Sequence, residues 1–163
     1  MVVAHPDDET IFYGGILQAH RRHPWHVICV TDGNADGDGA RRKMDFLAAC
    51  GQLKVAHAEM WDLPDIYSKR LDLGKIDLRL SNLKRPNAVF THGILGEYGH
   101  PHHQDVSLAV HRHFKHPIQV WGVAYNSFPQ KTFRLSKKAF QLKQKILSET
   151  YLSQTVNFAR YLS

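Results

Sequence analysis

Short runs of apolar residues alternate along the chain with segments whose apolar residues recur at the 3.6-residue period of a helix. The apolar runs predict strands at Val2–Ala4, His26–Thr31, Ala56–Trp61, Ala88–Thr91 and Ile118–Ala124. The periodic segments predict helices at Thr10–Arg22, Ala40–Gln52, Leu73–Leu83, His103–Phe114 and Ser136–Thr150. Strands that alternate with helices in this way form a mostly parallel sheet with helices on both faces. We therefore expect a single α/β domain over residues 1–163.

Polar clusters follow three of the predicted strands. A parallel α/β sheet binds its ligand beyond the carboxyl ends of its strands, so residues directly after a strand are candidates for chemistry. The clusters are HPDDE at residues 5–9, TDGNADGDG at 31–39 and THGILGEYGHPHHQD at 91–105. We expect all three to meet at one edge of the sheet.

HPDDE combines a histidine and carboxylates at the corner after the first strand. Pro6 restricts the backbone there, so His5 and Asp8 can face one point. Neutral imidazole and carboxylate are good zinc ligands, and a catalytic zinc has three protein ligands and one open position. The HPHH run at residues 100–103 offers a further histidine. The alternatives are acidic residues that complement a helix dipole and a His-rich surface turn.

The second cluster carries a weaker signal. Asp32, Asp36 and Asp38 partly match a calcium-binding loop, but no glutamate stands at the EF-hand position. We interpret the segment as a flexible glycine-rich loop beside the site. Arg42 follows one helical turn later and is expected to extend toward substrate oxygens, with an exposed helix-face arginine as the alternative.

Composition narrows the function classes. The net charge is +6 and the chain has 12 histidines, but its basic residues are scattered without interleaved aromatic residues, which argues against nucleic-acid binding. Two cysteines in apolar surroundings are expected to be buried thiols. No apolar run is long enough to span a membrane, and no signal peptide follows Met1, so a cytoplasmic location is expected. A targeting segment before Met1 and a homo-oligomer are left open.

The runs AHPDDE, TDG and GEYGHPHH, together with FRLS and YLSQ near the end, resemble the LmbE/PIG-L family of metal-dependent N-deacetylases. The resemblance implies a Rossmann-like fold. It also implies that His5, Asp8 and His103 ligate Zn²⁺, with other divalent first-row metals as alternatives. Asp7 matches the general base of the family, and His100 matches the histidine that stabilises the oxyanion.

The same resemblance implies hydrolysis of the acetamide of an N-acetylated amino sugar or glycan by a zinc-activated water. The alternatives are a metallo-amidase that cleaves a larger sugar conjugate and a non-enzymatic metal- or carbohydrate-binding relic. Substrate contacts are predicted for Asp32, Arg42 and Glu97. One departure from the family is His102, where many relatives have an aspartate thought to orient the catalytic histidine.

Overall fold

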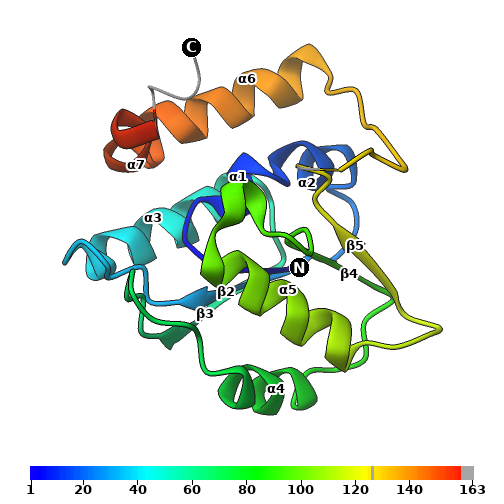
Figure 1. Cartoon of the computed structure of the whole chain (residues 1–163). Coiled ribbons are helices and arrows are strands. Elements are labelled where there is room, and N and C mark those ends of the chain that lie inside the picture. Colours follow the sequence, from blue (N-terminus) through cyan, green and yellow to red (C-terminus); the bar gives the residue numbers. More distant parts are fainter. Residues whose placement is uncertain (126, 159–163) are drawn as a thin grey trace.

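The computed structural model describes residues 1–125 and 127–158, so residue 126 and residues 159–163 of the predicted domain lie outside the described residues (Figure 1). Short strands alternate with helices through most of the chain, as predicted. The order is β1 Val2–Val3, α1 Asp8–Ile11, α2 Gly14–Ala19, β2 His26–Thr31, α3 Gly39–Gln52, β3 His57–Leu63, α4 Leu73–Ser81, β4 Ala88–Thr91, a 3₁₀ turn Glu97–Gly99, α5 Pro101–His113, β5 Gln119–Gly122, α6 Lys137–Lys145, a π turn Ile146–Thr150 and α7 Leu152–Phe158.

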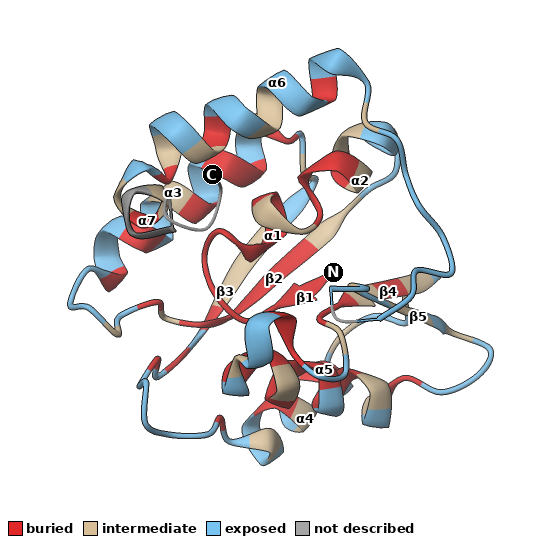
Figure 2. Ribbon diagram, turned by 45° about the horizontal axis from the view of Figure 1, so that its top comes forward, coloured by how far each residue is buried: buried red, intermediate tan, exposed pale blue. Residues whose placement is uncertain are grey.

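All strand pairs are parallel. β1 pairs with β2 and β2 with β3, while β4 pairs with β5 in a second ladder. β4 lies on the other side of β1 from β2 (Figure 2). The two ladders are linked by a side chain, because the Ala4 N–H donates to His92 Nε2 at 2.9 Å. The strand order therefore reverses direction between β1 and β4, where an α/β sheet places its ligand.

Helices cover both faces of these strands, which confirms the predicted fold class. α4 and α5 pack on one face through apolar residues such as Ile76, Val106 and Val110. α2, α3, α6 and the turn after α6 pack on the other through Leu17, Phe46 and Ile146, among others. Within the described ranges, no helix has the length and hydropathy needed to cross a membrane.

The predicted helix Thr10–Arg22 is in fact two short helices, α1 and α2, separated at Phe12 and Tyr13. Tertiary contacts override the periodic pattern here. The Tyr13 hydroxyl donates to the carbonyl of Thr91 at the end of β4. α2 then begins at two glycines, and a Cβ at Gly15 would lie 2.1 Å from a methyl group of Leu135. A side chain at position 15 would displace Leu135, and glycine weakens a continuous helix.

The end of the chain returns to the start of the sheet. α6 begins as predicted with Ser136 as its N-cap, whose hydroxyl accepts from the Ala139 N–H at 3.2 Å. A π turn then replaces the rest of the predicted helix. This turn directs the buried Tyr151 toward the first polar cluster, where its hydroxyl donates to Glu9 at 2.9 Å.

Candidate metal centre and active site

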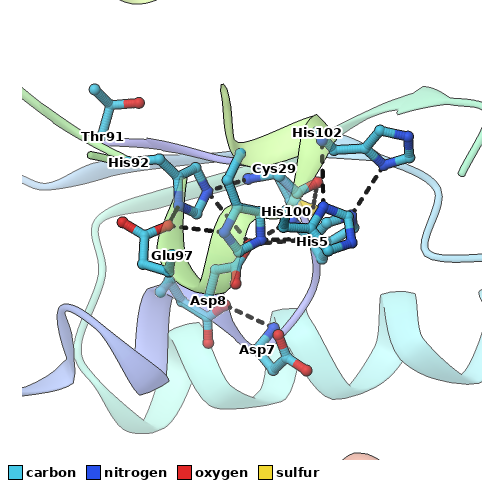
Figure 3. A network of polar contacts seen from close by, with 12 residues as sticks. His5, Asp7, Asp8, Cys29, Thr91, His92, Glu97, His100 and His102 are labelled. Atoms are coloured by element: carbon cyan, nitrogen blue, oxygen red, sulfur yellow. Dashed lines mark hydrogen bonds and ion pairs between the residues drawn. The ribbon is translucent and has the colours of Figure 1, made fainter. Parts of the chain in front are cut away.

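The first polar cluster turns sharply after β1. Asp7 has a φ of 114°, a conformation that strains any residue other than glycine. The chain reverses there, so α1 begins at Asp8 and the Asp8 carboxylate accepts the His5 N–H at 2.7 Å. Two adjacent aspartates thereby take different positions, with Asp8 beside His5 and Asp7 away from it (Figure 3). A strained turn of this kind is typical of functional sites.

The side chains of His5, Asp8 and His103 meet in a triangle of possible ligand atoms. His5 Nδ1 lies 3.1 Å from His103 Nε2, and Asp8 Oδ2 lies 3.4 Å from the former and 3.5 Å from the latter. Tetrahedral zinc with ligands at about 2.0–2.2 Å separates its ligand atoms by about 3.3–3.6 Å. Two edges of the triangle lie in this range and the third is about 0.2 Å shorter, so the triangle suits one tetrahedral zinc ion with a position left open.

The ionisation of the triangle also suits a metal. Burial lowers the pKa of His103, against the opposing effect of Asp8, so the imidazole is neutral. Burial raises the pKa of Asp8, but His103 and His92 outweigh it and hold that pKa well below its ordinary value. A neutral imidazole and an ionised carboxylate are the forms that bind metal.

Glu97 orients His103 from behind. Its Oε2 accepts from His103 Nδ1 at 2.7 Å, which leaves the Nε2 lone pair of His103 for a metal. The same carboxylate accepts from His92 Nδ1 at 2.5 Å and from the Gly93 N–H at 2.9 Å. Glu97 is fully buried by these contacts. The predicted substrate contact of Glu97 does not agree with this position, because both of its oxygens are engaged behind the triangle.

His92 is a buried histidine of the site that the sequence analysis did not single out. It follows β4 directly, and His5 lies two residues after the end of β1, so its place after a strand was the available signal. Its Nε2 accepts the Ala4 N–H at 2.9 Å and its Nδ1 faces Glu97. Both ring nitrogens are occupied, so His92 supports the triangle and is not available as a further ligand.

His102 supports the other side of the triangle (Figure 3). Its Nδ1 lies 3.1 Å from His5 Nε2, and its Nε2 donates to the Lys69 carbonyl at 2.8 Å. With the proton of His102 on Nε2, His5 donates from its own Nε2 and keeps Nδ1 free for a metal. Asp65, in the loop after β3, lies 3.4 Å from His102 Nδ1 and 3.8 Å from His5 Nε2. The sequence analysis did not identify Asp65.

His100 lies in front of the triangle. Its ring centroid is 4.7 Å from those of both His5 and His103. As the N-cap of α5, its Nδ1 accepts the His102 N–H at 3.2 Å, which places the ring hydrogen on Nε2. Burial, with His5 and His103 next, lowers the pKa of His100 to about 3. His100 is therefore a neutral hydrogen-bond donor.

Arg42 lies beneath the HPDDE turn and is only 6% exposed. Its guanidinium donates to the carbonyl of Pro6 at 2.8 Å and to that of Gly33 at 3.3 Å, and it lies 3.5 Å from Asp7 Oδ2. This position differs from the predicted pocket wall. The side chain is directed at protein oxygens, so it holds the turn and places a positive charge beside Asp7.

Two hollows flank the site. One, of about 480 Å³, lies between the loops after β2 and β3 and is lined by polar residues that include Asp32, Asn34 and Asp65. Asp32 lies at this wall, as predicted, although its Oδ1 accepts from the N–H groups of Asn34 and Asp65. The other, of about 730 Å³, is lined mainly by apolar and aromatic residues, among them Phe12 and Trp121.

Comparison with known proteins finds relatives of the chain. Over 170 residues the chain is 29% identical to the uncharacterized protein L374 of Acanthamoeba polyphaga mimivirus, covering 93% of this chain and 74% of that one. Over 129 residues it is 28% identical to the N-acetylglucosaminyl-phosphatidylinositol de-N-acetylase of Saccharomyces cerevisiae, covering 68% of this chain but only 41% of the yeast enzyme. The chain thus spans less than half the length of that enzyme.

The fold is shared with a solved structure of N,N'-diacetylchitobiose deacetylase from Pyrococcus horikoshii. The TM-score is 0.76 at 16% sequence identity, over 92% of this chain and 68% of that one. The family model described as PIG-L, GlcNAc-PI de-N-acetylase, matches residues 1–114, which include both the HPDDE turn and the HPHH run. The chain therefore belongs to the PIG-L family of LmbE-like deacetylases.

Proposed function

We propose that the protein is a zinc-dependent hydrolase that removes the acetyl group from an N-acetylated amino sugar, with the metal held by His5, Asp8 and His103. The observation that carries the proposal is the triangle of their ligand atoms, whose edges of 3.1, 3.4 and 3.5 Å suit tetrahedral zinc. Other first-row divalent metals accept the same two imidazoles and one carboxylate. When bound, such a metal lowers the pKa of a coordinated water and polarises a carbonyl.

Asp7 is the proposed general base. Asp7 is 5% exposed and precedes Asp8 in the turn, and its proposed role is to accept a proton from the water that attacks the amide. Burial and Asp8 raise the pKa of Asp7, while Arg42 opposes them. The guanidinium thus favours the ionised carboxylate that a base requires.

His100 is the proposed donor to the oxyanion. It presents a neutral Nε2–H at the front of the triangle, so it donates a hydrogen bond without first being protonated. Loss of one such donor typically costs about 10²–10³ in rate. The amide nitrogen leaves after it takes a proton, and the proposed donor is the Asp7 carboxyl, protonated in the earlier step.

The proposed substrate is an N-acetylglucosamine-type sugar. The names of the yeast and Pyrococcus relatives describe enzymes that deacetylate substrates of this type. In this chain the 480 Å³ hollow is lined by Asp65, which lies 3.8 Å from His5, and offers polar groups for sugar hydroxyls, with Asp32 as the proposed contact on its wall.

A larger amide conjugate is the second candidate. The aromatic groove of 730 Å³ reaches Gly93, Gly96 and Glu97, the segment that carries the support for His103. An acetyl group is far smaller than this groove, which suits a bulkier apolar substituent on the acyl group or on the sugar.

The test is to measure the acid that the zinc-loaded protein releases from a panel of N-acylated substrates. The sugar part of the substrate is varied by using N-acetylglucosamine, N,N'-diacetylchitobiose and an N-acetylglucosaminyl lipid. An N-octanoyl glucosamine tests the larger acyl group. We expect acetate release that a chelator abolishes and that Asp7→Asn lacks. Release of octanoate alone would favour the second candidate. Zinc binding without any release from the panel would contradict a hydrolase and favour a binding relic.

A further inference from the structure

We propose that His26, His57 and Glu59 form a second site for a divalent transition-metal ion, at the amino-terminal edge of the sheet. The three side chains each offer one ligand atom, and these atoms lie within 4.8 Å of one another. Two imidazoles and a carboxylate are ligands for zinc, nickel or copper(II). The proposal does not rest on the proposed deacetylase activity.

The register of β2 and β3 brings the three residues to one face. His26 and His57 are the first residues of their strands and are paired directly across the parallel ladder. Glu59 follows His57 by two residues, and side chains two apart on a strand point to the same face. The ring centroids of the two histidines are 4.5 Å apart. The backbone thus holds all three donors before any ion arrives.

One distance between ligand atoms of the cluster suits a shared ion. His26 Nε2 lies 3.2 Å from Glu59 Oε1, close to the edge of about 3.3–3.6 Å that tetrahedral zinc requires. The carboxylate is held in place, because Oε1 also accepts from Trp61 Nε1 at 3.2 Å.

One buried nitrogen of the cluster lacks a well-formed hydrogen bond. Within the described part of the chain, His26 Nε2 is shielded from solvent and makes no hydrogen bond of acceptable geometry, although Glu59 Oε1 lies 3.2 Å away. A buried polar atom left unpaired is costly, and coordination to a cation would satisfy it. The other two side chains face solvent, since Glu59 is about one third exposed and His57 is exposed. An ion can therefore reach the cluster from outside.

The cluster is separate from the triangle at the active site. β2 runs for six residues from His26 toward the carboxyl edge, a distance of roughly 17 Å. An ion at this edge would clamp the first residues of β2 and β3 together. Its effect would therefore be on stability, and no group of the proposed catalytic machinery takes part.

Equilibrium dialysis of the chelator-treated chain against zinc, followed by elemental analysis, tests the proposal. We expect about two zinc ions per chain in the wild type. His103→Ala should keep only the second ion, and adding His57→Ala to it should remove that ion as well. In the His103→Ala background zinc should raise the Tm, and Glu59→Gln should reduce the rise.

His23→Ala is the matched control, because His23 is exposed and has a histidine neighbour, His20, at a ring separation of 5.8 Å. It should leave the second ion in place. If His103→Ala binds no zinc, or if His57→Ala leaves its zinc content unchanged, the second site does not exist. Loss of the second ion in His23→Ala would mean that this ion binds near His23 and not at the proposed cluster. None of these results depends on deacetylase activity.

Discussion

The side chain of His102 bonds to His5 and not to its neighbour His100. His102 Nδ1 lies 3.1 Å from His5 Nε2, and the opposite nitrogen of His102 is fixed by the Lys69 carbonyl at 2.8 Å. The residue that departs from the family motif therefore orients a proposed metal ligand. The hydrogen bond from His102 to His100 comes from its backbone N–H, which any amino acid other than proline supplies.

His102→Ala should weaken zinc binding by about 10–100-fold, the usual cost of losing a group that orients a metal ligand. The measurement is the zinc dissociation constant by competition with a chromophoric chelator. Once the variant is saturated with zinc, its kcat should recover most of the wild-type value. An unchanged dissociation constant combined with a low kcat would place His102 in the chemistry instead.

His102→Asp tests whether this position tunes His100. Since the position faces His5, the new carboxylate should not raise the pKa of His100. The basic limb of kcat/KM against pH should therefore superimpose on that of the wild type, with both proteins zinc-loaded. A shift of the basic limb upward by about one pH unit is what a carboxylate close to His100 would produce. That shift would contradict the assignment of position 102 to His5.

Arg42→Gln should move the acidic limb of kcat/KM to higher pH. Arg42 lies 3.5 Å from Asp7 and lowers its pKa, so losing the guanidinium raises the pKa below which the base is protonated. We expect a fall in kcat at neutral pH that is larger than any change in KM. Arg41→Gln is the control, because the neighbouring Arg41 pairs with the exposed Asp38. A change in KM alone would indicate that Arg42 contacts the substrate, as the sequence analysis predicted.

Glu9→Gln should alter how stability depends on pH in the metal-free protein. Burial raises the pKa of Glu9 from 4.5 to about 7, although hydrogen bonds from Thr10 and Tyr151 oppose it. A carboxyl whose pKa is raised on folding stabilises the fold below about pH 4.5 and loses that effect as pH rises through about 7. The variant should therefore gain stability relative to the wild type between pH 4.5 and 8, by roughly 3 kcal/mol.

The unfolding free energy of both proteins, measured in denaturant across this pH range, checks the prediction. Glu149→Gln is the matched control, because the side chain of Glu149 is 65% exposed. Parallel curves for the wild type and Glu9→Gln would mean that Glu9 is already ionised at no cost in the folded chain.

Much of the architecture could be predicted from local patterns. The alternation of apolar runs and helical periods predicts the parallel α/β fold, and residues directly after strands are brought to one edge by the topology alone. His5, Asp8 and His103 meet for this reason. The break between α1 and α2 could not be predicted from local patterns, because Tyr13, where the helices separate, bonds to Thr91, which is distant in sequence.

The supporting residues were harder to foresee. His92 and Asp65 stand alone in the sequence without a motif, and their positions depend on the order of the strands. Glu97 and Arg42 carry charges that suggest an exposed contact, yet both are buried by partners that only the folded chain supplies. The link from Tyr151 to Glu9 joins the two ends of the described chain and has no local signal.

The central claim is that the two adjacent aspartates have different roles, with Asp8 as a metal ligand and Asp7 as the general base. The most direct measurement is the zinc bound per chain after equilibrium dialysis of Asp8→Ala and Asp7→Asn, both made in the His57→Ala background so that the proposed second site is absent. The account predicts about one zinc ion in Asp7→Asn and none in Asp8→Ala. Zinc retained by Asp8→Ala at wild-type affinity, or lost from Asp7→Asn, would contradict it.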